Sequence, residues 1–283
     1  MDLRRRWAKA AVVAGVAALA MSGCGGDSSK GDTGQPRKSV AANKYHLNNS
    51  GKLTVGMNLQ FKPEMYLKDG QPAGYDVDLL KKLAADMGVQ LDIQNLDFNG
   101  LIPGLQSKKF DLVSVGLSDT AERRKAVDFT RGYVPYVQVL GVPENTNTEA
   151  TVGAFNASNK TITALQGSTG EKLAKATFPK AKQAAFPDQN AALLQVATGR
   201  ADGIVVEDYL LAQFQKSNPG RLKQAALPEP LALEYGSWAV QKGNTAFVQY
   251  LNDWLCGAQK DGSLAKIYES AFGVSQAPEF PPC

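Results

Sequence analysis

The chain has 283 residues, of which 43% are hydrophobic and 20% are charged, and its formal net charge is +4. This length is enough for one large or two small α/β domains. Residues 1–23 contain four basic residues and one acidic residue, so the net charge of the remainder is only +1. Because the sequence has no basic patch with interleaved aromatic residues, we do not expect it to bind nucleic acid.

The first 23 residues have the pattern of a secretory signal peptide. Three consecutive arginines precede a run of small apolar residues, 10–21, that is too short to span a bilayer. The run ends in Met-Ser-Gly-Cys24, which resembles the processing box of bacterial lipoproteins. The resemblance implies that Cys24 is lipidated and begins the mature chain; the alternative is an ordinary cleaved signal with a free thiol. We expect an exported protein that is lipid-anchored to the cell membrane and faces the periplasm or the cell exterior.

Residues 24–46 have the composition of a flexible tether. They are rich in Gly, Ser, Asp and Lys and contain almost no apolar side chains, so they cannot form a core. A coil of this length has a root-mean-square span of roughly 25 Å. His46, at its end, is the only histidine in the chain, and we expect it to be a surface residue. A lone histidine argues against Ser–His–Asp or Cys–His catalysis and against a histidine-rich metal site, so we expect neither a metal nor a cofactor.

The first half of the globular part has a strand–helix–strand pattern. Residues 53–57 and 89–93 are predicted strands, and between them Asp76 is the candidate N-cap of an amphipathic helix that ends at Gly88. Such a unit predicts a parallel sheet, and ligands bind such sheets outside the carboxyl ends of the strands. Three segments leave strand ends here: residues 58–66, 97–100 and 116–123.

The stretch from 111 to 129 carries the clearest signal for binding an anion. A predicted buried strand over 110–115 is followed by Gly116, which permits a close approach of the backbone. Ser118 lies in a turn, and Thr120 opens a helical turn whose free N–H groups are expected to point at an anion. Arg123 adds a permanently charged planar fork, which suits a carboxylate.

These residues resemble the signature of the polar amino-acid solute-binding proteins of ABC importers, family 3 of the solute-binding proteins. The usual pattern is roughly Ser-Gly-Met-Thr-Ile-Thr-Pro-Glu-Arg followed by Val-Asp-Phe. The chain departs from it at Val115, Asp119 and Ala121, and keeps the glycine, the hydroxyl at Ser118, Thr120, Glu122, Arg123 and Asp128-Phe129. The resemblance extends from about residue 52 to 273, with a second match at Asp-Gly-Ser-Leu-Ala-Lys-Ile-Tyr-Glu (261–269).

The resemblance implies an α/β fold of the type II periplasmic-binding-protein class. Two lobes, each a mixed but mostly parallel sheet flanked by helices, would be joined by two hinge crossings near 138–142 and 235–238. Lobe 1 would consist of residues 47–140 and 236–283, and lobe 2 of residues 141–235. Predicted elements consistent with this plan are strands at 161–165 and 204–206, extended segments at 134–142 and 233–240, and helices at 171–178, 190–198, 247–260 and 262–272.

The resemblance also places an amino acid between the lobes. Its carboxylate would be held by Arg123, Ser118, Gly116 and, from the opposite side, by Thr169. Thr169 belongs to a Gly-Ser-Thr-Gly turn at the start of a predicted helix, which repeats the anion-binding logic of the first lobe.

Glu207 stands where the family usually has an aspartate that pairs with the ligand's α-ammonium. Asp208 is the alternative for this role. A further interpretation is that the acid only complements the dipole of the following helix.

Three residues are candidates for the side-chain end of the site. Phe61 and Phe98 stand where the family has aromatic residues against the ligand, and their loop positions beside Pro and Gly favour a pocket wall; the alternative is that both are core residues, since Phe is usually buried. Glu64 replaces a family aromatic, which indicates either a cationic ligand or merely a solvated loop charge.

Cys256 and Cys283 remain once Cys24 is lipidated. An even pair in an exported protein predicts a disulfide that ties the Pro-rich tail to a helix. The alternative is a buried free Cys256 beside a frayed tail.

The resemblance implies a monomeric, non-enzymatic binding protein that delivers an amino acid, polar or basic, to a membrane permease. The chain has no Gly-x-x-x-x-Gly-Lys phosphate loop, so the ATPase of the transporter is expected to be a separate protein. Two alternatives stay open: an enzyme of the same fold, similar to cyclohexadienyl dehydratase, and a ligand-sensing receptor subunit.

Overall fold

The computed structural model describes residues 44–147 and 151–283, which belong to one compact unit. Cys24, with the predicted signal peptide and nearly all of the predicted tether, lies outside the described residues. Within those residues, no helix combines the length and the apolar character that a membrane span requires.

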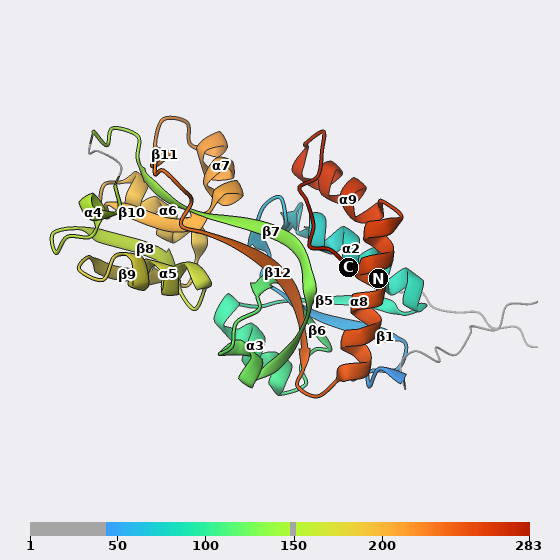
Figure 1. Cartoon of the computed structure of the whole chain (residues 1–283). Coiled ribbons are helices and arrows are strands. Elements are labelled where there is room, and N and C mark those ends of the chain that lie inside the picture. Colours follow the sequence, from blue (N-terminus) through green and yellow to red (C-terminus); the bar gives the residue numbers. More distant parts are fainter. Residues whose placement is uncertain (1–43, 148–150) are drawn as a thin grey trace, which may run out of the picture. The chain divides into compact units, whose positions relative to one another are not determined.

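Nine strands of the described part form one mixed sheet, in the order β5-β1-β6-β12-β7-β10-β8-β9, with β11 paired to β7 (Figure 1). Pairing is parallel in β5–β1–β6 and in β10–β8–β9, whereas β7 and β12 pair antiparallel with each other and with their neighbours. The strands are β1 (Lys52–Met57), β5 (Gln90–Asn95), β6 (Leu112–Ser118), β7 (Val127–Pro143), β8 (Thr161–Leu165), β9 (Lys182–Phe186), β10 (Gly203–Glu207), β11 (Leu222–Gln224) and β12 (Ala232–Gln241).

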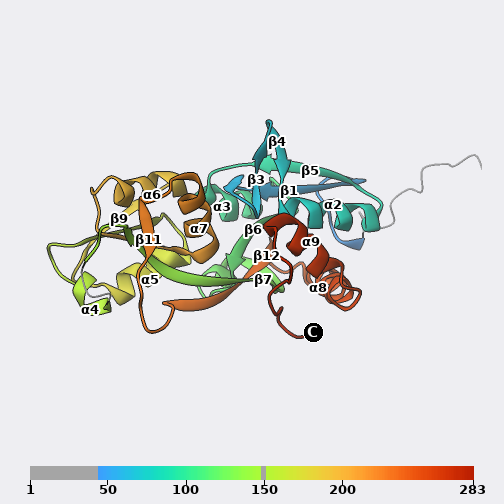
Figure 2. The same ribbon diagram turned by 90° about the horizontal axis from the view of Figure 1, so that it is seen from above.

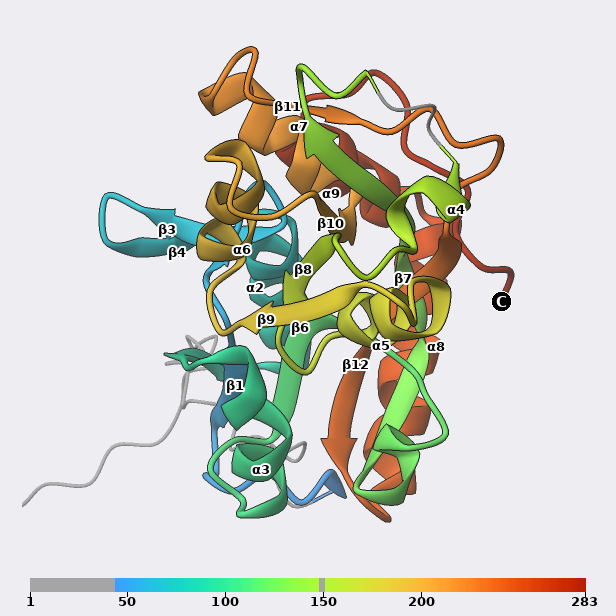
Figure 3. The same cartoon turned by 90° about the vertical axis from the view of Figure 1, so that its left-hand side faces the viewer.

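The two parallel groups of strands define two lobes. Lobe 1 surrounds β5–β1–β6 and contains α2 (Tyr75–Met87), α3 (Leu101–Gln106), α8 (Thr245–Lys260), α9 (Ser263–Phe272) and the 3₁₀ turns η1 (Phe98–Gly100) and η2 (Arg123–Lys125). It also carries a small sheet that projects as a hairpin in Figures 2 and 3, made of β2 (Gln60–Phe61), β3 (Met65–Lys68) and β4 (Gln71–Ala73). Lobe 2 surrounds β10–β8–β9 and contains α4 (Val152–Phe155), α5 (Thr169–Thr177), α6 (Gln189–Ala197) and α7 (Asp208–Ser217).

The paired strands β7 and β12 carry the chain between the lobes (Figure 1). Gly236 of β12 still lies opposite β6, and Gln138 of β7 already lies opposite β10. Residues 135–137 and 233–235 therefore pair only with each other. The crossings predicted at 138–142 and 235–238 are displaced by a few residues, because most of those residues are already part of a lobe's sheet.

The start of α2 differs from the prediction. Asp76 is not the N-cap: the helix begins at Tyr75, and Gly74 is the N-cap residue. Gly74 has a φ of 114°, and a Cβ at this position would lie 2.5 Å from the carbonyl oxygen of Glu64, so only glycine fits. Asp76 therefore lies inside the first turn and faces the interior.

The carboxyl group of Asp76 is fully buried beneath the pocket described below. Its Oδ2 accepts hydrogen bonds from Ser114 Oγ (2.5 Å) and Tyr133 Oη (2.6 Å), and its Oδ1 has no partner among the described residues. Burial raises the pKa of Asp76 to about 7, although the two hydrogen bonds lower it. The folded protein therefore favours the neutral form of this carboxyl group.

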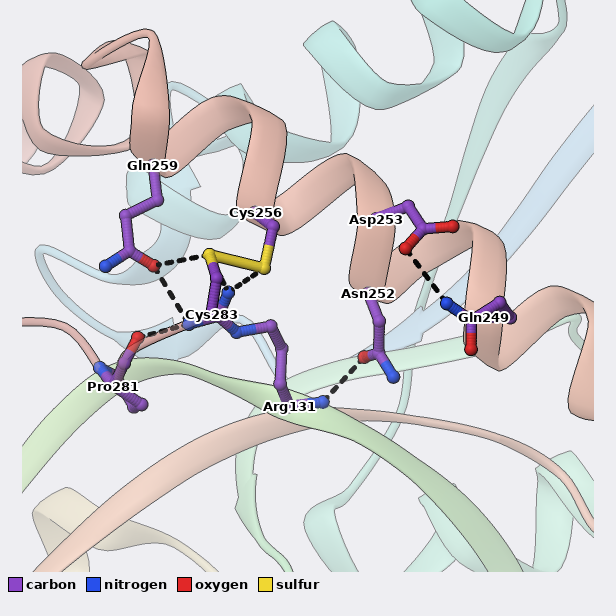
Figure 4. Close-up of a disulfide and its surroundings, with 8 residues drawn as sticks. All are labelled: Arg131, Gln249, Asn252, Asp253, Cys256, Gln259, Pro281 and Cys283. Carbon is purple, nitrogen blue, oxygen red and sulfur yellow. Dashed lines mark hydrogen bonds between the residues drawn. A yellow bond between two sulfur atoms is a disulfide. The ribbon is translucent and has the colours of Figure 1, made fainter.

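Cys256 of α8 and Cys283 are joined by a disulfide in the structure, with Cα atoms 5.7 Å apart, a usual separation (Figure 4). The side chain of Arg131, from β7, lies against the bridge. Its Nη2 donates to Gln259 Oε1 (2.9 Å) and to the carbonyl of Pro281, and its Nη1 donates to both sulfur atoms. The tail is thus held to α8 by a covalent bond and to β7 by Arg131.

The Asp76→Asn variant should change how stability depends on pH. The folded protein holds the Asp76 proton up to about pH 7, whereas the unfolded chain loses it near pH 4, so this stabilising contribution is complete below about pH 4 and is lost towards pH 7. Urea unfolding of both proteins gives the difference between their free energies of unfolding, wild type minus Asp76→Asn. This difference should fall between about pH 4 and about pH 7 and should stay constant at higher pH. A difference that does not vary with pH contradicts the assignment. Asp78→Asn, at an exposed position of the same helix, is the control and should give a nearly flat difference.

Removing the disulfide should destabilise the protein. The bridge closes a loop with a sequence separation of 27, so Cys283→Ser should lower the free energy of unfolding by roughly 2–4 kcal/mol. Urea denaturation of the two proteins without reductant measures this loss. Thiol titration of denatured, unreduced protein with Cys24→Ala checks the pairing itself: two reactive thiols would refute it.

Candidate functional site

The structure brings the eight predicted ligand-binding residues to the same pocket between the lobes. Phe61, Glu64, Phe98, Gly116, Ser118 and Arg123 line it from lobe 1, and Thr169 and Glu207 from lobe 2. The remaining lining residues are Val115, Tyr136, Leu165, Ser168, Tyr209 and Leu210. The segments that were expected to leave the carboxyl ends of the parallel strands do meet here, as the topology requires. Their role in binding stays a prediction.

Arg123 connects the two lobes at this pocket. Its side chain is buried, and its Nη1 donates to the carbonyl of Ser118 (2.9 Å) while its Nη2 donates to the carbonyl of Gly167 in lobe 2 (3.1 Å). The guanidinium carbon lies 5.8 Å from the centre of the Phe98 ring, a distance suited to a cation–π contact. Burial lowers the pKa of Arg123, and the nearby carboxylates of Glu234 and Glu122 oppose that shift.

Two amide groups of the turn around Arg123 are bonded to Thr120. The N–H of Arg123 donates to Thr120 Oγ1 (3.2 Å), and the N–H of Arg124 donates to the carbonyl of Thr120 (2.9 Å). Thr120 thus accepts from two of the N–H groups at the start of the short 3₁₀ helix η2. That this turn and the guanidinium of Arg123 attract an anion stays a prediction.

Gly116 has a different neighbour from the one expected. Strand β6 does not end before Gly116 but runs on to Ser118, with Gly116 at a φ of 59°. A Cβ at this position would overlap the hydroxyl of Tyr136, which lies directly against the glycine. The close approach that the sequence predicted is therefore made by a side chain of the protein itself.

Ser118 and Thr169 both donate to a residue to which the sequence assigned no role. Ser118 Oγ lies 2.8 Å, and Thr169 Oγ1 2.6 Å, from the same oxygen of Glu234, and the two hydroxyl oxygens are 3.4 Å apart. Glu234 belongs to β12, in the stretch that pairs only with β7. Thr169 is held in place because it is the first residue of α5, whose N-cap Ser168 accepts a hydrogen bond from the N–H of Glu171 (3.0 Å). No local pattern around Glu234 distinguishes it from a surface acid.

Glu64 is a deep residue of the pocket. Only 1% of its surface is exposed, so the interpretation as a solvated loop charge is wrong. Its Oε1 accepts from Tyr136 Oη, and its Oε2 accepts from Tyr209 Oη of lobe 2 (2.5 Å). Burial raises the pKa of Glu64 well above its usual value, the neighbouring Asp76 raises it further, and the tyrosine hydrogen bonds lower it. Neither tyrosine was singled out from the sequence.

Glu207 lies at the end of β10 and lines the pocket, as predicted from its position after a buried strand. Its Oε1 accepts from Gln138 Nε2 (2.9 Å), and burial raises its pKa. Asp208 is the first residue of α7 and accepts from the N–H of the next residue, Tyr209 (2.8 Å). Of the two candidates for an ammonium partner, Glu207 is the one that lines the pocket.

Phe61 and Phe98 form an aromatic wall. Phe61 is buried and Phe98 half-buried, and their ring centres are 6.4 Å apart with the ring planes perpendicular. Both interpretations of these residues hold, because the rings pack with the core and also line the pocket.

The pocket therefore combines one basic side chain, Arg123, with two acidic side chains, the buried Glu64 and the half-buried Glu207. Its free volume is about 30 Å³, which is room for about two water molecules. Across the described residues, no group of three or more His, Cys, Asp or Glu side chains is arranged to hold a metal ion.

Comparison with known proteins places this arrangement in a family context. The arginine-binding extracellular protein ArtP of Bacillus subtilis is 26% identical over 264 residues, covering 92% of this chain and 96% of its own. The amino acid ABC transporter substrate-binding protein AbpA of Streptococcus pneumoniae, solved with L-arginine, superposes with a TM-score of 0.72 at 28% identity, covering 79% of this chain and 95% of its own.

One relative carries the name of an enzyme. Cyclohexadienyl dehydratase of Pseudomonas aeruginosa is 26% identical, covering 78% of this chain and 82% of its own. Most of the relatives are named as binding proteins.

The fold is the type II periplasmic-binding-protein fold of these structural neighbours, as the sequence predicted. The profile of the bacterial extracellular solute-binding proteins, family 3, matches residues 53–274, which is most of the chain. With two lobes on a continuous sheet and a charged pocket between them, the chain belongs to the bacterial extracellular solute-binding proteins of family 3.

Proposed function

We propose that this protein captures a basic L-amino acid between its two lobes and delivers it, as a monomer, to the permease of an ABC importer. The observation that carries the proposal is the charge pattern of the pocket: one guanidinium and two carboxyl groups, one buried and one half-buried, contributed by both lobes. Relatives named for arginine binding support the same class of ligand.

The backbone end of an amino acid needs a cation for its carboxylate and an acid for its ammonium. Arg123 of lobe 1 provides the cation, with three further N–H groups beyond the two already bonded to carbonyls. Glu207 of lobe 2 provides the acid. Since these groups come from opposite lobes, the ligand itself joins the lobes, which favours the closed arrangement once it is bound.

Glu64 selects the side chain of the ligand. A buried carboxylate is costly unless it is paired with a cation, and two tyrosines already orient both oxygens of Glu64. A guanidinium or ammonium at the end of the ligand side chain supplies the missing charge, while Phe61 and Phe98 cover its apolar part. A neutral side chain leaves Glu64 without that partner and binds more weakly.

Ligand entry requires motion. The free volume of about 30 Å³ is too small for an amino acid, so the lobes must part where β7 and β12 pair only with each other. Closure around the ligand then excludes water and strengthens the charge–charge contacts.

We also propose that Cys24 is lipidated after removal of residues 1–23. The Gly- and Ser-rich segment that follows then holds the binding domain near the outer face of the membrane, within reach of the permease. Mass spectrometry of the membrane-bound protein tests this: an unmodified Cys24, or a mature chain that starts elsewhere, is the contrary result.

A thermal-shift screen of the twenty amino acids, polyamines and opines, followed by calorimetry, tests the proposed ligand class. Arginine, lysine or histidine should raise the melting temperature most, because a ligand that binds only the folded state stabilises it by mass action. No shift with any amino acid contradicts the proposal. Turnover of prephenate or arogenate by the same preparation would instead favour the enzymatic alternative, which the dehydratase relative keeps in view.

Arg123→Ala should abolish most of the affinity. Leaving a ligand carboxylate unpaired in a buried site costs roughly 3–5 kcal/mol, or about two to four orders of magnitude in the dissociation constant. Calorimetry with the ligand found in the screen measures the loss. Arg124→Ala is the matched control, since Arg124 is exposed and pairs with Asp119, and its affinity should stay within about twofold of the wild type. Wild-type affinity in Arg123→Ala would refute the assignment.

Glu64→Gln should change selectivity more than stability. It keeps the shape of the side chain but removes its charge, so affinity for L-arginine or L-lysine should fall about tenfold or more, whereas that for L-glutamine should not fall. Competition calorimetry gives the ratio of the two affinities. Glu144→Gln, at an exposed acid, is the control and should leave the ratio unchanged. An equal loss for both ligands would mean that Glu64 only supports the fold.

A further inference from the structure

Glu234 is a carboxylate beside the proposed carboxylate-binding residues that the proposed function does not use. It is half-buried on β12, between the exposed residues Leu233 and Tyr235, and does not itself line the pocket. One of its oxygens accepts from Ser118 of lobe 1 and from Thr169 of lobe 2, at 2.8 and 2.6 Å.

The hydroxyl protons decide what these two residues offer to a ligand. Each hydroxyl carries one proton and can donate only one hydrogen bond at a time. In the structure both protons are directed to Glu234, so only lone pairs remain for the pocket. A ligand carboxylate needs donors, and lone pairs repel it.

The position of Glu234 also affects Arg123. The carboxylate is close enough to act as an internal counter-charge to the guanidinium, whose Nη1 and Nη2 donate to carbonyls of the two lobes. Glu234 thus stands in, within the protein, for the chemical group that the ligand brings.

We propose that Glu234 is a specificity-determining residue that competes with the ligand carboxylate for the hydroxyls of Ser118 and Thr169. The carboxylate of an amino acid gains both donors only when the Glu234 side chain turns away. Residues 233–235 pair with β7 alone, so this movement takes place on a stretch that belongs to the sheet of neither lobe. Glu234 therefore weakens the binding of amino acids relative to the corresponding amines.

This inference rests on the proposed function, and two pairs of probes separate the two. L-Arginine and agmatine, and L-lysine and cadaverine, differ only by the carboxylate. In Glu234→Gln the hydroxyls are released from a charged acceptor, so affinity for L-arginine should rise about tenfold, while that for agmatine changes by less than about twofold. Glu234→Ala lacks any acceptor at this position. Like Glu234→Gln, it should raise the ratio of the dissociation constant for agmatine to that for L-arginine.

Glu122→Gln is the matched control. Glu122 also lies near Arg123, but it is exposed, pairs with Lys172 and bonds neither hydroxyl. Its neutralisation should leave the ratio of the agmatine and L-arginine dissociation constants unchanged. This control therefore distinguishes the release of the two hydroxyls from the general loss of a negative charge near Arg123.

Each outcome of the calorimetry is decisive. If the wild type binds none of the four probes and neither L-histidine nor histamine, the proposed function fails and this inference fails with it. If it binds only L-histidine or histamine, the same ratio is measured with that pair. If the wild type binds L-arginine but Glu234→Gln has the wild-type ratio, or loses affinity equally for both members of a pair, only the inference is overturned, because a purely structural role affects both alike.

Discussion

The arrangement of the pocket depends on one buried cation, the guanidinium of Arg123. A charge in this position is tolerated only if acceptors surround it, and the protein supplies them from both lobes: the carbonyl of Ser118 on one side and that of Gly167 on the other. The same group is therefore a link between the lobes and the binding site that we propose for the ligand carboxylate. Any ligand that bonds to it enters a contact that already joins the two halves of the molecule.

The acidic side chains around this cation are held in conditions that oppose their ionisation. Burial raises the pKa of Glu64, Asp76 and Glu207 together, and Asp76 adds to the effect on Glu64. A cationic ligand reverses this balance, because it replaces lost hydration with a direct partner. The preference that we propose for a positively charged side chain thus follows from the shortage of cations in the pocket rather than from its shape.

The paired strands β7 and β12 do more than connect the lobes. They also supply Tyr136 and Gln138, which orient Glu64 and Glu207, and Glu234, which holds Ser118 and Thr169. Residues that orient the binding groups thus lie on the segment about which the lobes would move. Opening and closing are expected to change the hydrogen bonds of the site as well as its size.

The sequence by itself determined the parts that are local. The strand–helix–strand pattern predicted a parallel sheet, and the ends of its strands led to Arg123, Thr169 and Glu207, because side chains that follow such strands gather at one edge. Only the tertiary structure decided that Asp76 is buried and that tyrosines flank Glu64. It also revealed Glu234, which lies 116 residues from Ser118 and 65 from Thr169. Local propensity and spacing carry no information about such contacts, because they arise only when distant segments pack together.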